Sequence, residues 1–167
     1  MERTHDELML EALRVAASGL EAGELPIGAV VTLDGAVIAA RHTGEVATRR
    51  LLAHAELLAL EDVERLGIKR RRETRLYATV EPCLMCLGAA MTFGVGMVVY
   101  ALPSPSDGAV ALVEGWRRDP KAFPSYRTPT IVGGVLRLES AALFEEYVRR
   151  HTSGGMWEWA KTLVSGT

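Results

Sequence analysis

The sequence predicts an α/β fold in layers, with a sheet between helices. Three observations predict this class. Apolar stretches of strand length alternate with stretches of helix length, an Asp-Gly pair separates two of the apolar stretches, and the composition is that of a globular protein. The chain has 167 residues, of which 49% are hydrophobic, and this suffices for a sizeable core. We therefore expect a single domain over residues 1–167.

The N-terminal part predicts a helix followed by a β-hairpin. Apolar side chains recur on one stripe of a helix that ends at Gly23, and Thr4 and Glu7 have the spacing of a capping box. Two apolar runs then enclose Asp34-Gly35, which is the strongest short-range signal for a hairpin. The two strands are expected at 27–33 and 36–40.

Helices and strands alternate in the next part, so consecutive strands are expected to be parallel and joined by crossovers. The predicted elements are a helix at 52–66 capped by Gly67, a strand at 76–80, a helix at 83–93 and a strand at 97–102. Prolines are frequent between residues 103 and 130, which predicts mostly loop with a short helix near 109–114. The last predicted elements are a strand at 131–136 and helices at 140–151 and 156–164.

Composition and charge exclude several classes of protein. Nineteen basic and twenty-one acidic residues give a net charge of −2, so the totals do not predict a broad face for nucleic acid. Two cysteines cannot form a disulfide framework, and we expect a cytoplasmic protein. Residues 83–102 carry no charge, but glycines interrupt them. A buried helix and a buried strand explain this stretch better than a transmembrane helix, so no membrane partner is expected.

Two short motifs carry candidate chemistry. The first is His54-Ala55-Glu56, near the start of one predicted helix, and the second is Glu81-Pro82-Cys83-Leu84-Met85-Cys86, at the start of the next. Two cysteines separated by two residues can chelate one soft metal ion, and His54 would complete a set of three ligands for Zn²⁺. Three protein ligands leave a fourth position open, as catalytic zinc sites do. Glu56 is then placed to take a proton from water in that position.

Several polar and aromatic side chains also have an interpretation that does not involve metal binding or catalysis on a substrate. A lone C-x-x-C motif at a strand–helix junction can be a redox pair. Residues 69–72 are expected to form a solvated basic turn, with a nucleic-acid contact as the alternative. Trp157 and Trp159 are expected to pack in the last helix, with the rim of a pocket or a subunit interface as the alternative. The histidines expected at surface or hydrogen-bonded positions rather than as ligands are His5, His42 and His151.

Four segments together form a recognisable pattern. They are Pro26-Ile27-Gly28-Ala29-Val30, His54-Ala55-Glu56, residues 79–89 and Val98-Val99-Tyr100-Ala101. H-x-E followed by P-C-x-x-C is the signature of zinc-dependent deaminases. The sequence thus resembles the cytidine/deoxycytidylate deaminase superfamily, and it is most similar to the branch of tRNA adenosine deaminases, guanine deaminases and related base deaminases.

The resemblance has several implications. It implies a three-layer α/β/α cytidine-deaminase-like fold, with a five-stranded mixed sheet and helices on both faces. His54, Cys83 and Cys86 would bind zinc, and Glu56 would move protons during hydrolytic release of ammonia from an aminated ring. The resemblance also implies a homodimer.

Substrate contacts are expected at positions where the chain departs from this branch. Many of its members place Asn after the second strand to hold the base or ribose, whereas this chain has Thr43 there, or His42 one place earlier. Residues 48–52, Thr-Arg-Arg-Leu-Leu, replace small polar residues. Asp107 could accept a hydrogen bond from a ring N–H, or it could be a turn residue before Gly108. Ala55 is a further candidate contact.

We expect the substrate to be a small-molecule nucleobase or nucleoside, for example guanine, cytosine or a related aminated ring. A folded anionic RNA would favour a more basic surface than this chain offers. One alternative is a tRNA-specific adenosine deaminase that forms inosine. Another is a catalytically silent, zinc-binding partner subunit, against which the intact set of His54, Glu56, Cys83 and Cys86 argues.

Overall fold

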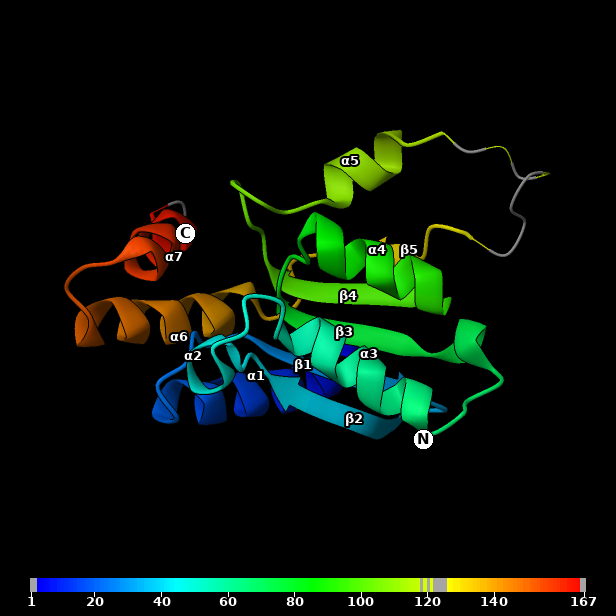
Figure 1. Ribbon diagram of the computed structural model, residues 1–167, viewed down its shortest axis with the longest axis horizontal. Coiled ribbons are helices and arrows are strands. Elements are labelled where there is room, and N and C mark those ends of the chain that lie inside the picture. Colours follow the sequence, from blue (N-terminus) through cyan, green and yellow to red (C-terminus); the bar gives the residue numbers. More distant parts are fainter. Residues whose placement is uncertain (1–2, 118, 120, 122–125, 166–167) are drawn as a thin grey trace.

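The computed structural model describes residues 3–117, 119, 121 and 126–165 (Figure 1). Its centre is a mixed sheet with the strand order β2-β1-β3-β4-β5. The strands are β1 (Gly28–Leu33), β2 (Ala36–His42), β3 (Arg75–Val80), β4 (Met97–Leu102) and β5 (Thr130–Val132). β1 pairs antiparallel with β2 and β3, whereas β3, β4 and β5 are parallel. The five-stranded mixed sheet and its parallel crossovers are therefore confirmed.

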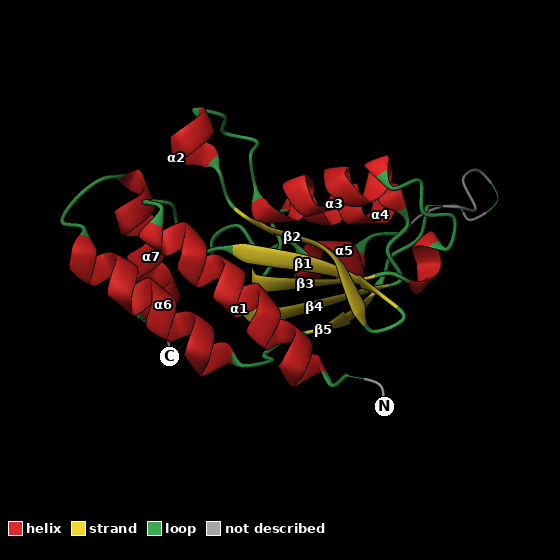
Figure 2. Cartoon of the chain, turned by 90° about the horizontal axis from the view of Figure 1, so that it is seen from below, coloured by secondary structure: helices red, strands yellow, loops and turns green. Residues whose placement is uncertain are grey.

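Helices cover both faces of the sheet, as predicted (Figure 2). The helices of the described residues are α1 (His5–Glu21), α2 (Glu45–Thr48), α3 (Ala55–Arg65), α4 (Leu84–Phe93), α5 (Val110–Gly115), α6 (Arg137–Arg150) and α7 (Gly155–Val164), with a 3-10 turn, η1 (Arg71–Glu73). α3 and α4 lie on one face, α1 and α6 lie on the other, and α7 packs against α6. Among the described residues, no helix has both the length and the apolar composition needed to cross a bilayer.

The burial of β1 shows why the layers form. Successive side chains of a strand point to opposite faces of the sheet. Ala29 and Val31 accordingly join the core beneath α3 and α4, whereas Val30 joins the core beneath α1. All three side chains are fully buried. A strand with buried side chains on both faces requires cover on both faces, and the helices supply it.

Local signals in the N-terminal part are confirmed. Thr4 and Glu7 form the predicted capping box of α1: the Glu7 backbone N–H donates to the Thr4 hydroxyl, and the Thr4 backbone N–H donates to the Glu7 carboxylate at 2.7 Å. In the hairpin turn, Asp34 and Gly35 have φ values of 52° and 76°. Two positive φ angles are what a two-residue type I′ turn requires.

Some boundaries differ from the prediction. α3 begins at Ala55 rather than at residue 52, because His54 is its N-cap and residues 51 and 52 are exposed. The four-residue helix α2 is absent from the sequence-based prediction, since it is too short to show a periodic pattern. β5 ends at Val132 rather than at residue 136, because Leu136 takes a left-handed conformation (φ 54°) as the N-cap of α6. Residues 118, 120 and 122–125 of the expected loop lie outside the described residues.

Candidate active site

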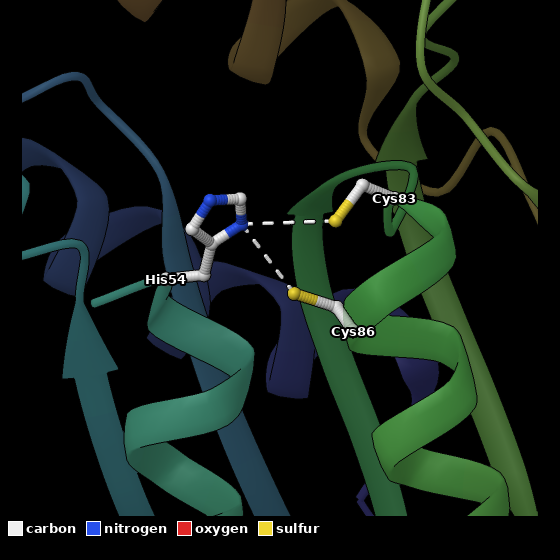
Figure 3. Close-up of side chains that lie close together, drawn as sticks. All are labelled: His54, Cys83 and Cys86. Carbon is white, nitrogen blue, oxygen red and sulfur yellow. Dashed lines mark hydrogen bonds between the residues drawn. The ribbon is translucent and has the colours of Figure 1, made fainter. Parts of the chain in front are cut away.

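Two helix N-termini bring the predicted metal ligands together. His54 is the N-cap of α3, Cys83 is the N-cap of α4, and Cys86 lies in the first turn of α4. The Nδ1 atom of His54 is 3.7 Å from Cys83 Sγ and 3.5 Å from Cys86 Sγ (Figure 3). All three ligand atoms lie within 4.8 Å of one another. The cluster therefore has the ligand number of a catalytic zinc site.

The spacing of these atoms also fits zinc. Zinc bonds of about 2.1 Å to nitrogen and about 2.3 Å to sulfur, at tetrahedral angles, place the two ligand atoms about 3.6 Å apart. The two nitrogen–sulfur separations, 3.5 and 3.7 Å, lie on either side of that value. Among the described residues, no further histidine, cysteine or acidic side chain joins these three as a fourth ligand. One coordination position is thus left for water or substrate.

The three ligands differ in their affinity for protons. Hydrogen bonding with Cys86, supported by His54, lowers the pKa of Cys83 to about 4. The hydrogen bond with Cys83 raises the pKa of His54 to about 9. Hydrogen bonding with Cys83 and burial both raise the pKa of Cys86. At neutral pH the metal-free cluster therefore holds a thiolate, a thiol and an imidazolium, and a metal ion must displace protons to bind.

Glu56 is buried beside the cluster in the first turn of α3, with 4% of the residue exposed. Its Oε2 atom is 3.6 Å from Cys86 Sγ. Burial raises the pKa of Glu56, because removal from water disfavours the charged form. A carboxyl group with a raised pKa can both take and return a proton near neutral pH, which is the property that a proton shuttle needs.

A pocket of about 240 Å³ opens at this cluster. His54, Glu56 and Cys83 form part of its wall, and Met156 and Trp159 of α7 form another part. Apolar side chains near the ends of strands also line it; they are Leu25, Ile27 and Val80. A pocket that combines apolar walls with several polar groups beside a metal cluster is typical of a site for a flat heterocycle.

Glu81 ties the loop after β4 to the pocket wall. Its two carboxylate oxygens accept hydrogen bonds from the backbone N–H groups of Ser104 and Val110, each at 3.1 Å. Gly108 passes so close that a Cβ atom there would lie 2.4 Å from the Glu81 carboxyl carbon. A side chain at position 108 would therefore displace either the loop or Glu81.

Three of the four residues predicted to contact substrate line this pocket, namely Thr43, Ala55 and Asp107. The Asp107 carboxylate accepts hydrogen bonds from the Ser104 hydroxyl and from Trp159 Nε1, the latter at 3.1 Å. Both contacts fix the orientation of the carboxylate.

His42, the other residue predicted to contact substrate, does not line the pocket. It is the last residue of β2, and it lies beside Gly19 of α1. Its Nδ1 atom is 2.6 Å from the backbone oxygen of Thr43. Because neighbouring residues of a strand point to opposite faces, the position one place before Thr43 turns away from the site.

Several lining residues carry no distinctive signal in the sequence. Glu45 lies two residues after Thr43, and its Oε1 is 3.9 Å from His54 Nε2, the ring nitrogen that faces away from the sulfurs. Trp159 is predicted to pack, with a pocket rim as the alternative. It does both, since its ring makes an edge contact with Phe144 at 5.8 Å and also lines the pocket. Only the tertiary position of α7 reveals this second role.

Similarity to known proteins agrees with this geometry. Residues 2–102 match the family model described as the cytidine and deoxycytidylate deaminase zinc-binding region. A protein named tRNA-specific adenosine deaminase from Bacillus subtilis is 34% identical over 148 residues, which is 87% of this chain and 90% of that protein. The segment matched by the family model includes both motifs of the site.

Solved structures give the same result. A structure from work on A-to-I editing by tRNA:A34 deaminases at the wobble position of transfer RNA has a TM-score of 0.69 and 34% identity, covering 82% of this chain and 98% of that one. Guanine deaminase from Nitrosomonas europaea has a TM-score of 0.69 and 29% identity, covering 86% and 84% of the two chains. The chain therefore belongs to the cytidine and deoxycytidylate deaminase family with its zinc-binding region, and it is a hydrolytic deaminase.

Proposed function

We propose that this chain hydrolyses adenosine in tRNA to inosine. The observation that carries the proposal is its similarity, over most of both chains, to a protein named tRNA-specific adenosine deaminase. Two features of the structure support the proposal as well: three residues that can bind zinc lie together, and a buried carboxyl group lies beside them at the same pocket. This substrate takes the place of the small molecule that the sequence alone favoured. The proposal includes a cytoplasmic location, where tRNA is found.

The chain's own residues account for the movement of protons. His54, Cys83 and Cys86 would hold a zinc ion, which would supply a nucleophile at neutral pH by lowering the pKa of water. Glu56 takes a proton from the attacking water, donates it to the ring nitrogen next to the amino-bearing carbon, and then assists loss of the amino group. Water and adenosine are consumed, and inosine and ammonia are formed. Burial of Glu56 keeps its proton from exchanging freely with bulk water.

The pocket wall supplies candidate contacts for the base. The Thr43 hydroxyl lies 3.0 Å from the backbone oxygen of Ala53 and 3.1 Å from Glu45 Oε2, so its proton is engaged within the protein. Thr43 therefore presents an acceptor oxygen to the pocket. An exocyclic amino group is a donor that matches such an acceptor.

Incubation of the zinc-loaded protein with an anticodon stem-loop that carries one adenosine at the wobble position tests the proposal. Mass spectrometry of the digested RNA should show inosine formed in proportion to time. The same stem-loop with guanosine at that position serves as the matched control. Failure to form inosine, together with ammonia release from a free base, would overturn the tRNA assignment and leave a small-molecule deaminase.

A free aminated base such as guanine is the second candidate substrate, and Asp107 is the observation in its favour. Its carboxylate lines the pocket and is held in place by Ser104 and Trp159. A carboxylate is an acceptor that matches the ring N–H and amino groups of a guanine edge. If this candidate is correct, Asp107→Asn should lower kcat/KM for the free base by at least about tenfold, since a charge-assisted hydrogen bond is lost.

A further inference from the structure

The loop between α2 and α3 carries side chains that the proposed reaction does not use. Arg49, Arg50, Leu51 and Leu52 are all exposed, and the two leucines are 79% and 61% exposed. Several other surface arginines pair with carboxylates, as Arg41 does with an acidic side chain of α3 at 2.5 Å. Within the part of the chain that the structure describes, the guanidinium groups of Arg49 and Arg50 have no hydrogen-bond or ion-pair partner. Two unpaired positive charges thus stand beside two exposed apolar side chains.

The base of this loop is held firmly. The Gly44 backbone N–H donates to the Ala53 backbone oxygen at 2.9 Å, and the Ala53 N–H donates to the Arg50 oxygen at 3.0 Å. The buried Glu24 carboxylate accepts hydrogen bonds from two backbone N–H groups of α2, at 3.0 and 2.8 Å. The loop therefore presents its exposed side chains from a fixed backbone, which lowers the entropy cost of binding.

The loop also stands at the rim of the pocket. Glu45 precedes it and His54 follows it, and both line the pocket. Figures 1 and 2 both place α2 and α7 at the end of the sheet where α3 begins, and Figure 2 shows α2 standing clear of the three layers. A base that enters the pocket would therefore bring its neighbouring nucleotides close to this loop.

We propose that residues 49–52 bind the nucleotides that flank the target base in a single-stranded RNA loop. Arg49 and Arg50 would contact phosphates, and Leu51 and Leu52 would pack against the neighbouring bases. Basic groups that follow the backbone, combined with apolar side chains against the bases, are how sequence-tolerant binding of single strands is achieved. A free nucleotide also has a phosphate, but it has no neighbouring bases for the leucines to contact. The inference rests on the proposed function, because it assumes that the target base is part of an RNA.

Binding of a fluorescent anticodon stem-loop by the full-length chain tests this surface. Arg49→Ala/Arg50→Ala should weaken binding by roughly tenfold for each arginine. The slope of log K against log salt should become shallower by about 1.4, which corresponds to the loss of two phosphate contacts on a single strand. Leu51→Ser/Leu52→Ser should weaken binding without changing that slope. Arg49→Lys/Arg50→Lys keeps the charges and should retain most of the slope.

The matched control is Arg14→Ala/Lys69→Ala, which removes two exposed positive charges outside the loop and should leave binding within about twofold of the wild type. Zinc content and thermal midpoint report folding for every variant. Unchanged RNA binding in Arg49→Ala/Arg50→Ala would overturn the inference, as would an equal loss for a nucleoside 5′-monophosphate. RNA binding that depends on Arg49 and Arg50 without inosine formation would support the surface and overturn the proposed function. If Arg49→Ala/Arg50→Ala forms inosine with the wild-type kcat/KM, the inference about residues 49–52 is overturned and the proposed function is not.

Discussion

The side chains at the starts of α3 and α4 have different chemical tasks because their surroundings differ. His54, Cys83 and Cys86 point their ligand atoms at a common centre. Glu56 lies two residues beyond His54, on the buried side of the same helical turn. Its pKa is raised by burial, whereas that of Cys83 is lowered by hydrogen bonds. Removal of single side chains should therefore separate metal binding from proton transfer.

Glu56→Ala tests that separation. The variant should keep one zinc per chain, because Glu56 is not part of the ligand group. Its kcat should fall by roughly 10²- to 10⁴-fold, since a general acid–base group is lost. Metal analysis and single-turnover kinetics measure the two effects. Glu61→Ala, an exposed position on α3, is the control and should leave both unchanged. Loss of zinc in Glu56→Ala would show that Glu56 is a ligand.

Zinc binding to the metal-free protein should release about two protons at pH 7, one from His54 and one from Cys86. The pKa of His54 is about 9 and that of Cys86 is raised, so both hold protons at this pH, whereas Cys83, with a pKa of about 4, does not. Because protons leave when the metal binds, the apparent zinc affinity should rise with pH, by up to about 100-fold per unit near neutrality. Calorimetry in buffers of different ionisation enthalpy counts the protons. A count near zero would contradict these protonation states.

At the scale of elements, the pocket depends on two connections that acidic side chains hold in place. Glu81 fixes the loop after β4, and Glu24 fixes α2. In both cases a carboxylate accepts hydrogen bonds from backbone N–H groups that lie outside regular hydrogen-bond ladders. Such contacts let short segments keep a defined position although they have few apolar contacts of their own.

Glu24→Ala should lower the free energy of unfolding by roughly 2 kcal/mol, because two backbone N–H groups of α2 lose a charged acceptor. Urea unfolding measures this change, and faster hydrogen exchange at residues 46 and 47 should accompany it. Glu21→Ala removes a nearby exposed carboxylate that pairs with Arg150, and it should cost less than about 0.5 kcal/mol. Equal effects of the two substitutions would show that Glu24 does not anchor α2.

At the scale of the whole molecule, an apolar surface lies over α4 and α5. Leu84, Leu112 and Trp116 are 60%, 64% and 41% exposed, and they line one groove of about 390 Å³ together with Val113 and Tyr126. Exposed apolar patches of this kind are typical of protein–protein contacts. We propose that a second copy of the chain covers this surface, in line with the homodimer that the family resemblance implies.

Light scattering during size exclusion tests the dimer. Leu112→Glu should shift the mass from dimer toward monomer, since a charge is placed within the buried contact. Leu138→Glu changes a leucine of α6 that is 72% exposed, and it should leave the mass unchanged. A wild-type chain that is monomeric at every concentration tested would contradict the proposed contact.

Much of this architecture could be predicted from the sequence, and the physical reasons are specific. The capping box of α1, the Asp34-Gly35 turn and the spacing of Cys83 and Cys86 are local patterns, so each is visible without tertiary structure. The position of α2 and the placement of Trp159 in the pocket depend on contacts between distant segments. The position of His42 beside α1 likewise depends on how β2 packs in the assembled sheet. The substrate residues are the least predictable part, because they line a cavity that only the assembled fold defines.

X-ray absorption at the zinc edge of the purified wild-type protein tests the central assignment most directly. We predict one zinc per chain, with two sulfur ligands at about 2.3 Å and lighter nitrogen or oxygen ligands in the remaining positions. Protein without stoichiometric zinc, or zinc bound by four sulfur atoms, would contradict this assignment.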